Sequence, residues 1–354
     1  MSHFKIALLV LLLLGNYKAE SKAPVSKIEI VNGKFRNSCD NPFFPWGFNY
    51  TNPEKIGLIE DNWSKKETRE IIAQDFQEMK ELGANVIRIH LQYNKFMIDA
   101  HTPDLQALNI LEQLVKVAEE KKIYLLITGL GAYTKSDQPD WYDNMNDEER
   151  WDTHKIFWRS IANYIGKYNS VFAYDLMNEP VMAVNCKEIN KCEWIVGDAF
   201  GSYHFIQNIS RNPDNKFHST IVRWADELKR AIRSVDEKTL VTIGFLPLGD
   251  LKPFSGSLDF ISTHIYPETG KIDDAIQFIL NNQSNVPLVI TETATLNCDE
   301  YELLHFLKQI ENKYEGAIGH YFGKTPGEHS DTILIDILHK NAIEFFTKNN
   351  PTTY

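Results

Sequence analysis

The sequence has little positive charge for its length. Across 354 residues, 37 lysines and arginines are set against 48 aspartates and glutamates, which leaves a formal net charge of −11 and a pI near 5.5. A nucleic acid or an anionic membrane surface is bound through a basic face. We therefore expect the protein to bind neither.

The apolar stretch at the start of the chain is too short to span a bilayer. Lys5 precedes the run from Ile6 to Leu14, which is about half the length that a membrane-spanning helix requires. This pattern predicts a secretory signal over residues 1–19 and a secreted or extracytoplasmic protein. A retained anchor is the alternative, because Tyr17 interrupts the small-residue pattern of a cleavage site.

Cysteine is scarce, with four residues at positions 39, 186, 192 and 298. They suit an exported protein with two disulfides, and of the three possible pairings we favour one that includes Cys186–Cys192. The spacing is not a zinc motif, and the chain lacks the His-x-His that a metal-dependent barrel hydrolase would need. We expect no metal and no other cofactor.

What the chain does contain is a regular alternation of strand-length apolar runs with helical segments. Eight such runs are present: Pro45–Tyr50, Ala84–Leu91, Ile123–Thr128, Val171–Met177, Leu240–Phe245, Asp259–Ile265, Pro287–Thr291 and Gly316–Phe322. The helical segments include residues 66–83, 104–122 and 220–238. In the last of these, one apolar stripe is formed by Ile221, Ala225, Leu228, Ile232 and Val235.

Eight strand–helix units predict an α/β fold, a single (β/α)8 TIM barrel over residues 24–354. The segment "KIEIVNGKF" adds a short N-terminal hairpin with its turn at Asn32-Gly33. The stretch Pro180–Phe217 is too long for an ordinary connection and predicts a long loop insertion after strand four. An open doubly wound sheet is the alternative, but the chain lacks its Gly-x-Gly-x-x-Gly turn.

Strand alternation indicates which polar side chains point to the barrel axis. In "ANVIRIHLQ" the apolar face belongs to the helices, so Arg88 and His90 point inward. In "DFISTHIYP" the inward residues are Ser262, His264 and Tyr266.

The same alternation assigns Leu288, Ile290 and Glu292 of "PLVITETA" to the inner face. In "YDLMNEP", residues 174–180, Glu179 ends a buried strand immediately before Pro180. Active sites of such barrels lie at the C-terminal ends of the strands, where these side chains converge. Two carboxylates and an arginine in one mouth are costly to desolvate, so we interpret them as a site.

Four motifs in order, "VIRIH", "YDLMNEP", "STHIYP" and "VITETA", resemble the glycoside hydrolases of clan A, most of all family 5, the cellulase-type family. The resemblance extends from "NPFFPWGFNY" to "GHYFGKTP". It implies a retaining β-glycosidase of endo-β-1,4-glucanase or β-mannanase type, which uses two carboxylates about 5 Å apart on a carbohydrate substrate.

By this resemblance, Glu179 would be the acid/base and Glu292 the nucleophile. The substrate-binding residues would be Arg88, His90, Asn178, His264 and Tyr266, with Arg88 and Tyr266 supporting Glu292.

The sequence departs from the family pattern in two places. Where the family often has a histidine after strand three, this chain has "ITGLGAY". Where the family commonly has a tryptophan at the end of strand eight, we expect Tyr321 to take its place as a stacking surface. Trp141 and Trp194 are further candidates for stacking on sugar rings, with packing in the core as the alternative for both.

Sequons for N-glycosylation begin at Asn49, Asn62, Asn208 and Asn282, and we expect the one at Asn49, inside the barrel rim, to stay unused. A non-catalytic glycan-binding barrel is the alternative function, because the same rim would hold sugar without cleaving it. The sequence leaves open the sugar backbone, internal or terminal cleavage, and the oligomeric state.

Overall fold

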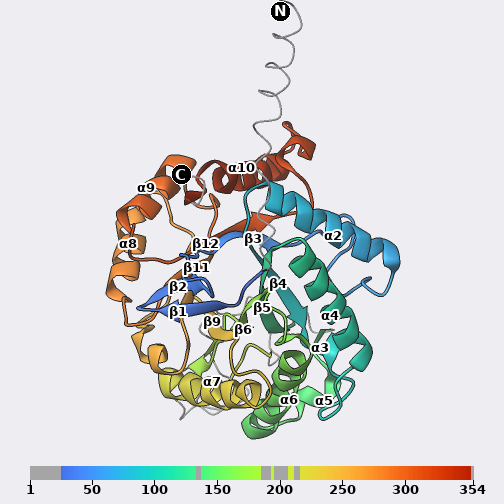
Figure 1. Cartoon of the computed structure of the whole chain (residues 1–354). Coiled ribbons are helices and arrows are strands. Elements are labelled where there is room, and N and C mark those ends of the chain that lie inside the picture. The colour runs from blue at the N-terminus through green and yellow to red at the C-terminus, as the bar shows by residue number, and fades with distance from the viewer. Residues whose placement is uncertain (1–24, 133–136, 185–192, 195–205, 211–215, 352–354) are drawn as a thin grey trace, which may run out of the picture.

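The computed structural model describes residues 25–132, 137–184, 193–194, 206–210 and 216–351. Eight parallel strands close into a barrel with the ring order β10-β11-β12-β3-β4-β5-β6-β9 (Figure 1). Their bounds are β3 Trp46–Tyr50, β4 Val86–Gln92, β5 Tyr124–Gly131, β6 Val171–Asn178, β9 Leu240–Phe245, β10 Ile261–His264, β11 Leu288–Glu292 and β12 Ala317–Tyr321. The predicted (β/α)8 barrel is confirmed, and each strand lies within two or three residues of its predicted run.

The helices form a ring around the barrel (Figure 1). They are α2 Lys66–Glu81, α3 Tyr93–Phe96, α4 Leu105–Glu120, α5 Asp140–Asp143, α6 Asp147–Ile165, α7 Phe217–Arg233, α8 Ile272–Asn281, α9 Glu300–Gln309 and α10 Leu334–Lys348, with short 3-10 helices η4 Lys252–Gly256 and η5 Pro326–Glu328. Within the described part of the chain, no helix is both long and apolar enough to cross a membrane.

Helix α7 shows why the periodic segments become helices. Ile221, Ala225, Leu228 and Ile232 of the predicted stripe are all buried against the barrel. The fifth residue, Val235, lies beyond the end of the helix and is 37% exposed, so the prediction is wrong there. The stripe holds only as long as the chain keeps the 3.6-residue period.

The predicted N-terminal hairpin is also present, as strands β1 Ile28–Val31 and β2 Lys34–Asn37. Its two turn residues, Asn32 and Gly33, have φ of 53° and 74°, as a two-residue hairpin loop of this kind requires. The hairpin crosses one end of the barrel (Figure 1). Its buried side chains Ile28 and Phe35 join an inner apolar cluster at the N-terminal ends of the strands, which leaves the C-terminal ends for the polar side chains.

The insertion after β6 lies partly outside the described residues. Its described parts include a two-stranded antiparallel sheet, β7 Ala183–Val184 paired with β8 Glu193–Trp194. Cys186 and Cys192 lie outside the described residues, so the structure does not test their pairing. Cys39 and Cys298 are free thiols, the first exposed and the second buried, so the expectation of two disulfides is wrong for these two residues.

Candidate active site

Two carboxylates meet at the C-terminal mouth of the barrel. Glu179 directly follows β6 and Glu292 ends β11, and β9 and β10 lie between these strands in the ring. An oxygen of Glu179 and an oxygen of Glu292 lie within 4.8 Å of each other. His264 lies between them, with Nδ1 2.7 Å from Glu179 Oε1 and Nε2 3.6 Å from Glu292 Oε1.

The backbone at Glu179 explains how this side chain reaches the mouth. Glu179 has φ of +50°, in the left-handed region that side-chain-bearing residues seldom adopt. Its N–H donates to the carbonyl oxygen of Gly244 at 2.8 Å, which ties the turn to β9. The chain therefore leaves the sheet abruptly, just before Pro180, with the carboxylate 29% exposed.

A different irregularity places Glu292. Thr263 of β10 pairs with Ile290, but the next residue, His264, pairs with Glu292, so Thr291 is an extra residue in β11. A bulge of this kind breaks the alternation of inward and outward side chains. Leu288 and Ile290, which precede the bulge, pack on the outer, helix-facing side, so their predicted orientation on the same inner face as Glu292 is wrong.

Thr291 and Glu292 both face inward at this bulge. The Thr291 hydroxyl is 2.5 Å from the hydroxyl of Ser262, and Val289, two residues earlier, belongs to the inner apolar cluster. The predicted inward orientation of Glu292 is correct, although strict alternation would have placed it outside together with Ile290.

Arg88 of β4 is the centre of the charged network. Its side chain is fully buried, and Nη1 lies 2.5 Å from Glu292 Oε1. Its other contacts are Asp175 Oδ2 at 2.7 Å, Asn178 Oδ1 at 3.0 Å and Asn49 Oδ1 at 2.8 Å. A buried guanidinium requires such partners, because leaving one charge of a buried pair uncompensated costs about 3–5 kcal/mol.

This network keeps Glu292 ionised. Burial alone would raise the pKa of the Glu292 carboxyl, but the neighbouring His264 and Arg88 hold it well below its usual range. The Tyr266 hydroxyl donates to Glu292 Oε2 at 2.8 Å. Burial and the nearby Glu292 charge raise the pKa of Tyr266, so its hydroxyl stays a proton donor.

Three residues of this network were not predicted as site residues. Asp175 is fully buried in β6 and accepts from Arg88, from the Thr128 hydroxyl at 2.8 Å and from the N–H of Gly244 at 2.8 Å. A charged residue in the middle of an apolar strand was the available signal. Asn49 is buried, and its amide donates to the carbonyl oxygens of Thr291 and Gly319, which agrees with the expectation that its sequon is unused.

Gly244 is the third such residue, and a glycine is needed here because the side chains of His264 and Arg88 lie close to its backbone. A Cβ at this position would lie 2.7 Å from His264 Nε2 and 3.1 Å from Arg88 Nη2. Any side chain here would displace the groups that hold the two carboxylates.

Strand β12 corrects another expectation. Tyr321 is fully buried on the outer face, where its hydroxyl donates to Glu78 Oε2 at 2.5 Å and its ring stacks on Tyr50. The prediction that it forms a sugar-stacking surface is therefore wrong. The inward residue is His320, whose Nε2 lies 2.9 Å from the Tyr266 hydroxyl. Alternation from Ile318, which faces the inner cluster, would have identified it.

The structure describes the side chain of only one of the two tryptophans expected to stack on sugar rings. Trp141 is half-buried against the outer core, where its ring packs on Tyr93 and Tyr142. Trp194 belongs to β8, and its side chain lies outside what the structure describes.

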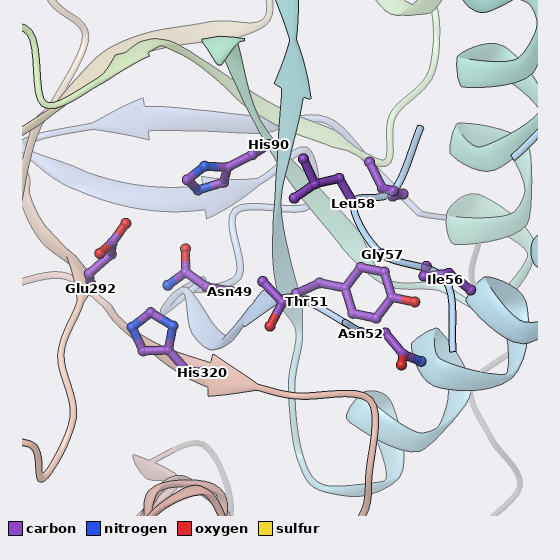
Figure 2. A pocket seen from close by; sticks show the side chains of 11 residues that line it. Asn49, Thr51, Asn52, Ile56, Gly57, Leu58, His90, Glu292 and His320 are labelled. Atoms are coloured by element: carbon purple, nitrogen blue, oxygen red, sulfur yellow. The ribbon is translucent and has the colours of Figure 1, made fainter. Parts of the chain in front are cut away.

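A cavity of about 190 Å³ opens beside Glu292. Figure 2 shows His90, Asn49, Glu292 and His320 around it, with the loop that follows β3 on the opposite side. Burial and the charge of Arg88 lower the pKa of His90 well below its usual value, so it faces the cavity as a neutral imidazole. One wall carries these polar side chains and the other carries apolar ones such as Ile56 and Leu58. Such a combination suits a sugar ring, which has both hydroxyl groups and apolar C–H faces.

Glu179, His264 and Glu292 are also close enough together to bind a metal ion. However, the positive charge of Arg88 lies 2.5 Å from Glu292, where a cation would have to approach. The arrangement favours two carboxylates that act directly on a substrate.

Comparison with known proteins decides the family. The sequence model of the family described as "Cellulase (glycosyl hydrolase family 5)" matches residues 47–321. The chain belongs to glycosyl hydrolase family 5. The matched region begins in β3 and ends with β12, so it contains every barrel strand and both carboxylates. No curated protein matches this family 5 chain by sequence.

Solved structures share the fold at low sequence identity. An endo-1,4-β-mannanase from Eisenia fetida matches with a TM-score of 0.63 and 16% identity, over 93% of this chain and 97% of that one. A β-glucanase from Saccharophagus degradans matches with a TM-score of 0.59 and 17% identity, over 92% and 93%. An exo-β-1,4-mannosidase from Opitutaceae bacterium strain TAV5 has a TM-score of 0.64 and 13% identity, and the chain covers 61% of its length.

The family assignment makes this protein a glycosidase with a carbohydrate substrate. Retaining β-glycoside hydrolases hold their carboxyl groups about 5–5.5 Å apart, whereas inverting enzymes separate them by about 6.5–9.5 Å to admit a water molecule. The approach of Glu179 to Glu292 within 4.8 Å fits the retaining class.

Proposed function

We propose that Glu292 is the nucleophile and Glu179 the acid/base of a double-displacement mechanism. The observation that carries the proposal is the distance of at most 4.8 Å between carboxylate oxygens from β11 and from the end of β6. In the first step, Glu292 attacks the anomeric carbon while Glu179 gives its proton to the departing glycosidic oxygen. In the second, Glu179 takes a proton from water, which attacks the same carbon and releases Glu292.

The different surroundings of the two carboxylates support these roles. Glu292 is 13% exposed and accepts from both Arg88 and Tyr266, which favours a permanently ionised group. Glu179 is 29% exposed, and its described hydrogen-bond partner is the ring of His264 rather than a fixed cation. A group that must carry a proton in one step and lose it in the next requires such a setting.

Asn178 is proposed to bind the sugar hydroxyl next to the anomeric carbon. Its Oδ1 accepts from Arg88 Nη2 at 3.0 Å, which orients the amide group of the side chain. His90 lines the cavity beside Glu292, and His264 joins the two carboxylates, so both are proposed to contact the sugar at the cleavage point.

The proposed substrate is a β-1,4-linked mannan or glucan. The activities of the similar structures support this range, since these include the Eisenia endo-mannanase, the Saccharophagus β-glucanase and the Opitutaceae exo-mannosidase. The cavity beside Glu292, with polar side chains on one wall and apolar side chains on the other, suits a neutral sugar chain.

The test is an assay of reducing-end release from mannan, glucomannan, cellulose and mixed-linkage β-glucan, with proton NMR of the first product formed. We expect release from at least one β-1,4-linked polymer, with the β-anomer appearing before mutarotation. Initial formation of the α-anomer would exclude the two-step mechanism, and inactivity on every polymer and on aryl β-glycosides would reject the hydrolase proposal.

Residues 24–354 are proposed to be the mature catalytic domain of a secreted protein, with residues 1–19 removed as a signal. The support is the Lys5 and Ile6–Leu14 pattern. Mass spectrometry of protein from the culture medium should find an N-terminus near residue 20; an intact Met1 on the secreted chain would contradict removal.

A further inference from the structure

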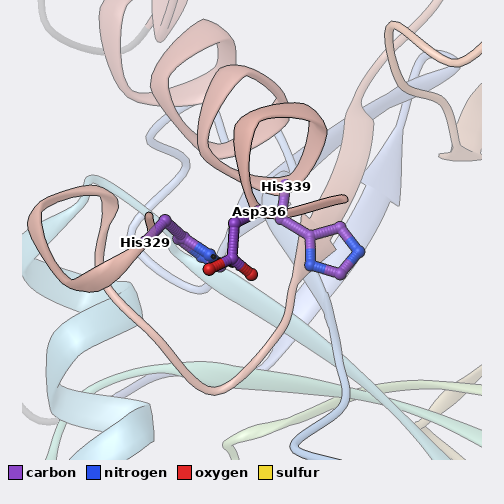
Figure 3. Close-up of side chains that lie close together, drawn as sticks. All are labelled: His329, Asp336 and His339. Atoms are coloured by element: carbon purple, nitrogen blue, oxygen red, sulfur yellow. Dashed lines mark ion pairs between the residues drawn. The ribbon is translucent and has the colours of Figure 1, made fainter. Parts of the chain in front are cut away.

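A second group of ionisable side chains lies apart from the two carboxylates. His329 follows η5 in the connection from β12 to α10, Asp336 lies in the first turn of α10, and His339 lies one turn later (Figure 3). Their ligand-type atoms all lie within 4.8 Å of one another. Asp336 and His339 are three residues apart, so they share one face of the helix.

His329 has an unusual environment. Its side chain is 1% exposed, yet neither ring nitrogen has a hydrogen-bond partner. The nearest carboxylate atom, Asp336 Oδ1, lies 3.6 Å from Nδ1, which is too far for a hydrogen bond. A buried polar group left without a partner is costly, and here the polar atoms face two further ligand-type residues.

We propose that His329, Asp336 and His339 bind a divalent transition-metal ion, with zinc as the best fit. Two imidazole nitrogens and one carboxylate oxygen are ligands that zinc takes readily, with a water molecule as the fourth. Two ligand atoms at about 2.0–2.1 Å from a tetrahedral ion are roughly 3.3–3.4 Å apart. The 3.6 Å between His329 Nδ1 and Asp336 Oδ1 is a few tenths of an ångström from this geometry.

The surroundings hold the other two ligands in place. Asp336 Oδ2 accepts the N–H of Ser330 at 2.9 Å, which leaves Oδ1 for an ion. The ring of His339 stacks on Phe322, with centroids 3.5 Å apart and planes 11° from parallel. Such outer contacts orient metal ligands before the ion arrives.

The charges around the cluster permit a cation. Lys324 acts on the cluster electrostatically, but it is paired with Glu54 at 2.6 Å, which offsets much of its charge.

An ion at this position would fix the segment that follows β12. Phe322 stacks on His339 on one side and on His320 on the other, with centroids 5.9 Å apart in the second pair. Metal binding is therefore expected to stabilise the rim of the barrel next to the cavity, and its detection does not depend on activity.

The test uses the full mature protein without a histidine tag, stripped of metal and titrated with Zn²⁺ by calorimetry and by thermal unfolding. We expect a site of micromolar affinity or better and a rise of a few degrees in Tm at saturation. His339→Phe retains the ring on Phe322, and Asp336→Asn retains an acceptor for Ser330. Each should lose one equivalent of bound zinc and the rise in Tm.

The matched control is His305→Ala, which removes an exposed histidine from α9 and should bind zinc like the wild type. Circular dichroism without metal checks that the variants are folded. Absence of zinc binding to the wild type, or wild-type stoichiometry and Tm response in both ligand variants, would overturn the proposal.

Discussion

The hydroxyl of Tyr266 donates to Oε2 of Glu292 at 2.8 Å. The other oxygen of the same carboxylate lies 2.5 Å from Arg88 Nη1, so each of the two oxygens accepts from a fixed donor. Glu292 is thus fixed in orientation and kept ionised, and these are the two properties that a carboxylate nucleophile needs.

Removal of the tyrosine hydroxyl should weaken that control. We expect Tyr266→Phe to lower kcat/KM by about ten- to a hundredfold, because a hydrogen bond to a charged group contributes about 1.5–3 kcal/mol. The pKa of Glu292 rises when a donor to its ionised form is lost. The acidic limb of the pH profile of kcat/KM should therefore move to higher pH.

The control for this change is Tyr168→Phe, which removes a similar hydroxyl that donates to Glu112 at 2.7 Å, outside the barrel. It should leave the pH profile unchanged. An unshifted acidic limb in Tyr266→Phe would show that the hydroxyl does not stabilise the ionised nucleophile.

The proposed acid/base role of Glu179 can be tested by removing its carboxylate. Loss of this carboxylate should reduce hydrolysis of polysaccharide by about 10²–10⁴-fold, the usual contribution of an acid/base. It should largely spare the first step on an aryl glycoside with a good leaving group, which needs little protonation. Equal loss on both substrates, measured by steady-state and burst kinetics, would count against the acid role.

The choice between alanine and glycine as the replacement for Glu179 should change the stability of the variant but not its residual activity. With φ at +50°, alanine would retain the strain and glycine would release it. Glu179→Gly should therefore exceed Glu179→Ala in free energy of unfolding by about 1 kcal/mol. Equal denaturation midpoints would show that the left-handed backbone at this position is not strained.

Strand β12 offers a paired comparison of neighbouring residues. His320→Ala removes an inward ring that bonds Tyr266 and lines the cavity, so kcat/KM should fall about tenfold or more. Tyr321→Phe removes a hydroxyl that donates to Glu78 on the outer face. It should cost about 1 kcal/mol of stability and leave kcat and KM unchanged. The reverse pattern in kinetics would restore Tyr321 as a sugar contact.

Strands β4 and β11 show which side-chain orientations can be predicted from the sequence and which cannot. Alternation alone identified Arg88 and His90 as inward residues, because β4 is regular up to His90. Alternation counted back from the inward Glu292 fails for Leu288 and Ile290, because the extra residue Thr291 lies between them and Glu292. Neither the composition of the strand nor the periodicity of its apolar residues predicts a bulge of this kind.

Only some of the residues that carry the chemistry of the site can be identified from the sequence. The two glutamates follow apolar strands and can be read from the sequence. Asp175 can be identified as unusual, because it is a charged residue inside an apolar strand. Its role cannot be predicted in the same way, because it depends on contact with Arg88, which is 87 residues away in the chain. An aromatic residue at a strand end does not by itself indicate a sugar contact. Tyr321 lies on the outer face, because alternation from the inward Ile318 makes His320 the inward residue.

Glu60 gives a pH dependence that belongs to stability rather than catalysis. It is 4% exposed and accepts the N–H of Gln92 at 2.6 Å, and burial raises its pKa from 4.5 to about 7. Between these values the folded chain binds a proton that the unfolded chain has released. The stabilising contribution is therefore complete below about pH 4.5 and is lost as the pH rises through 7.

Glu60→Gln should remove this dependence. Its carbonyl can accept the Gln92 N–H, and its amide can donate to Gln92 Oε1, which has no partner in the wild type. We expect urea unfolding to show the variant more stable than the wild type by about 1–3 kcal/mol at pH 8, with a much smaller difference at pH 5. Glu120→Gln, at the exposed end of α4, is the control. A gain of the same size at both pH values would refute a buried titrating group.

The most direct test of the central claim is to trap the covalent intermediate. A 2-deoxy-2-fluoro glycoside with a good leaving group, carrying the sugar that the polymer assays identify, should inactivate the enzyme with one label per chain. Peptide mass spectrometry should place that label on Glu292, and Glu292→Gln should take up none. A label on Glu179, or on any other residue, would contradict the assignment of the nucleophile.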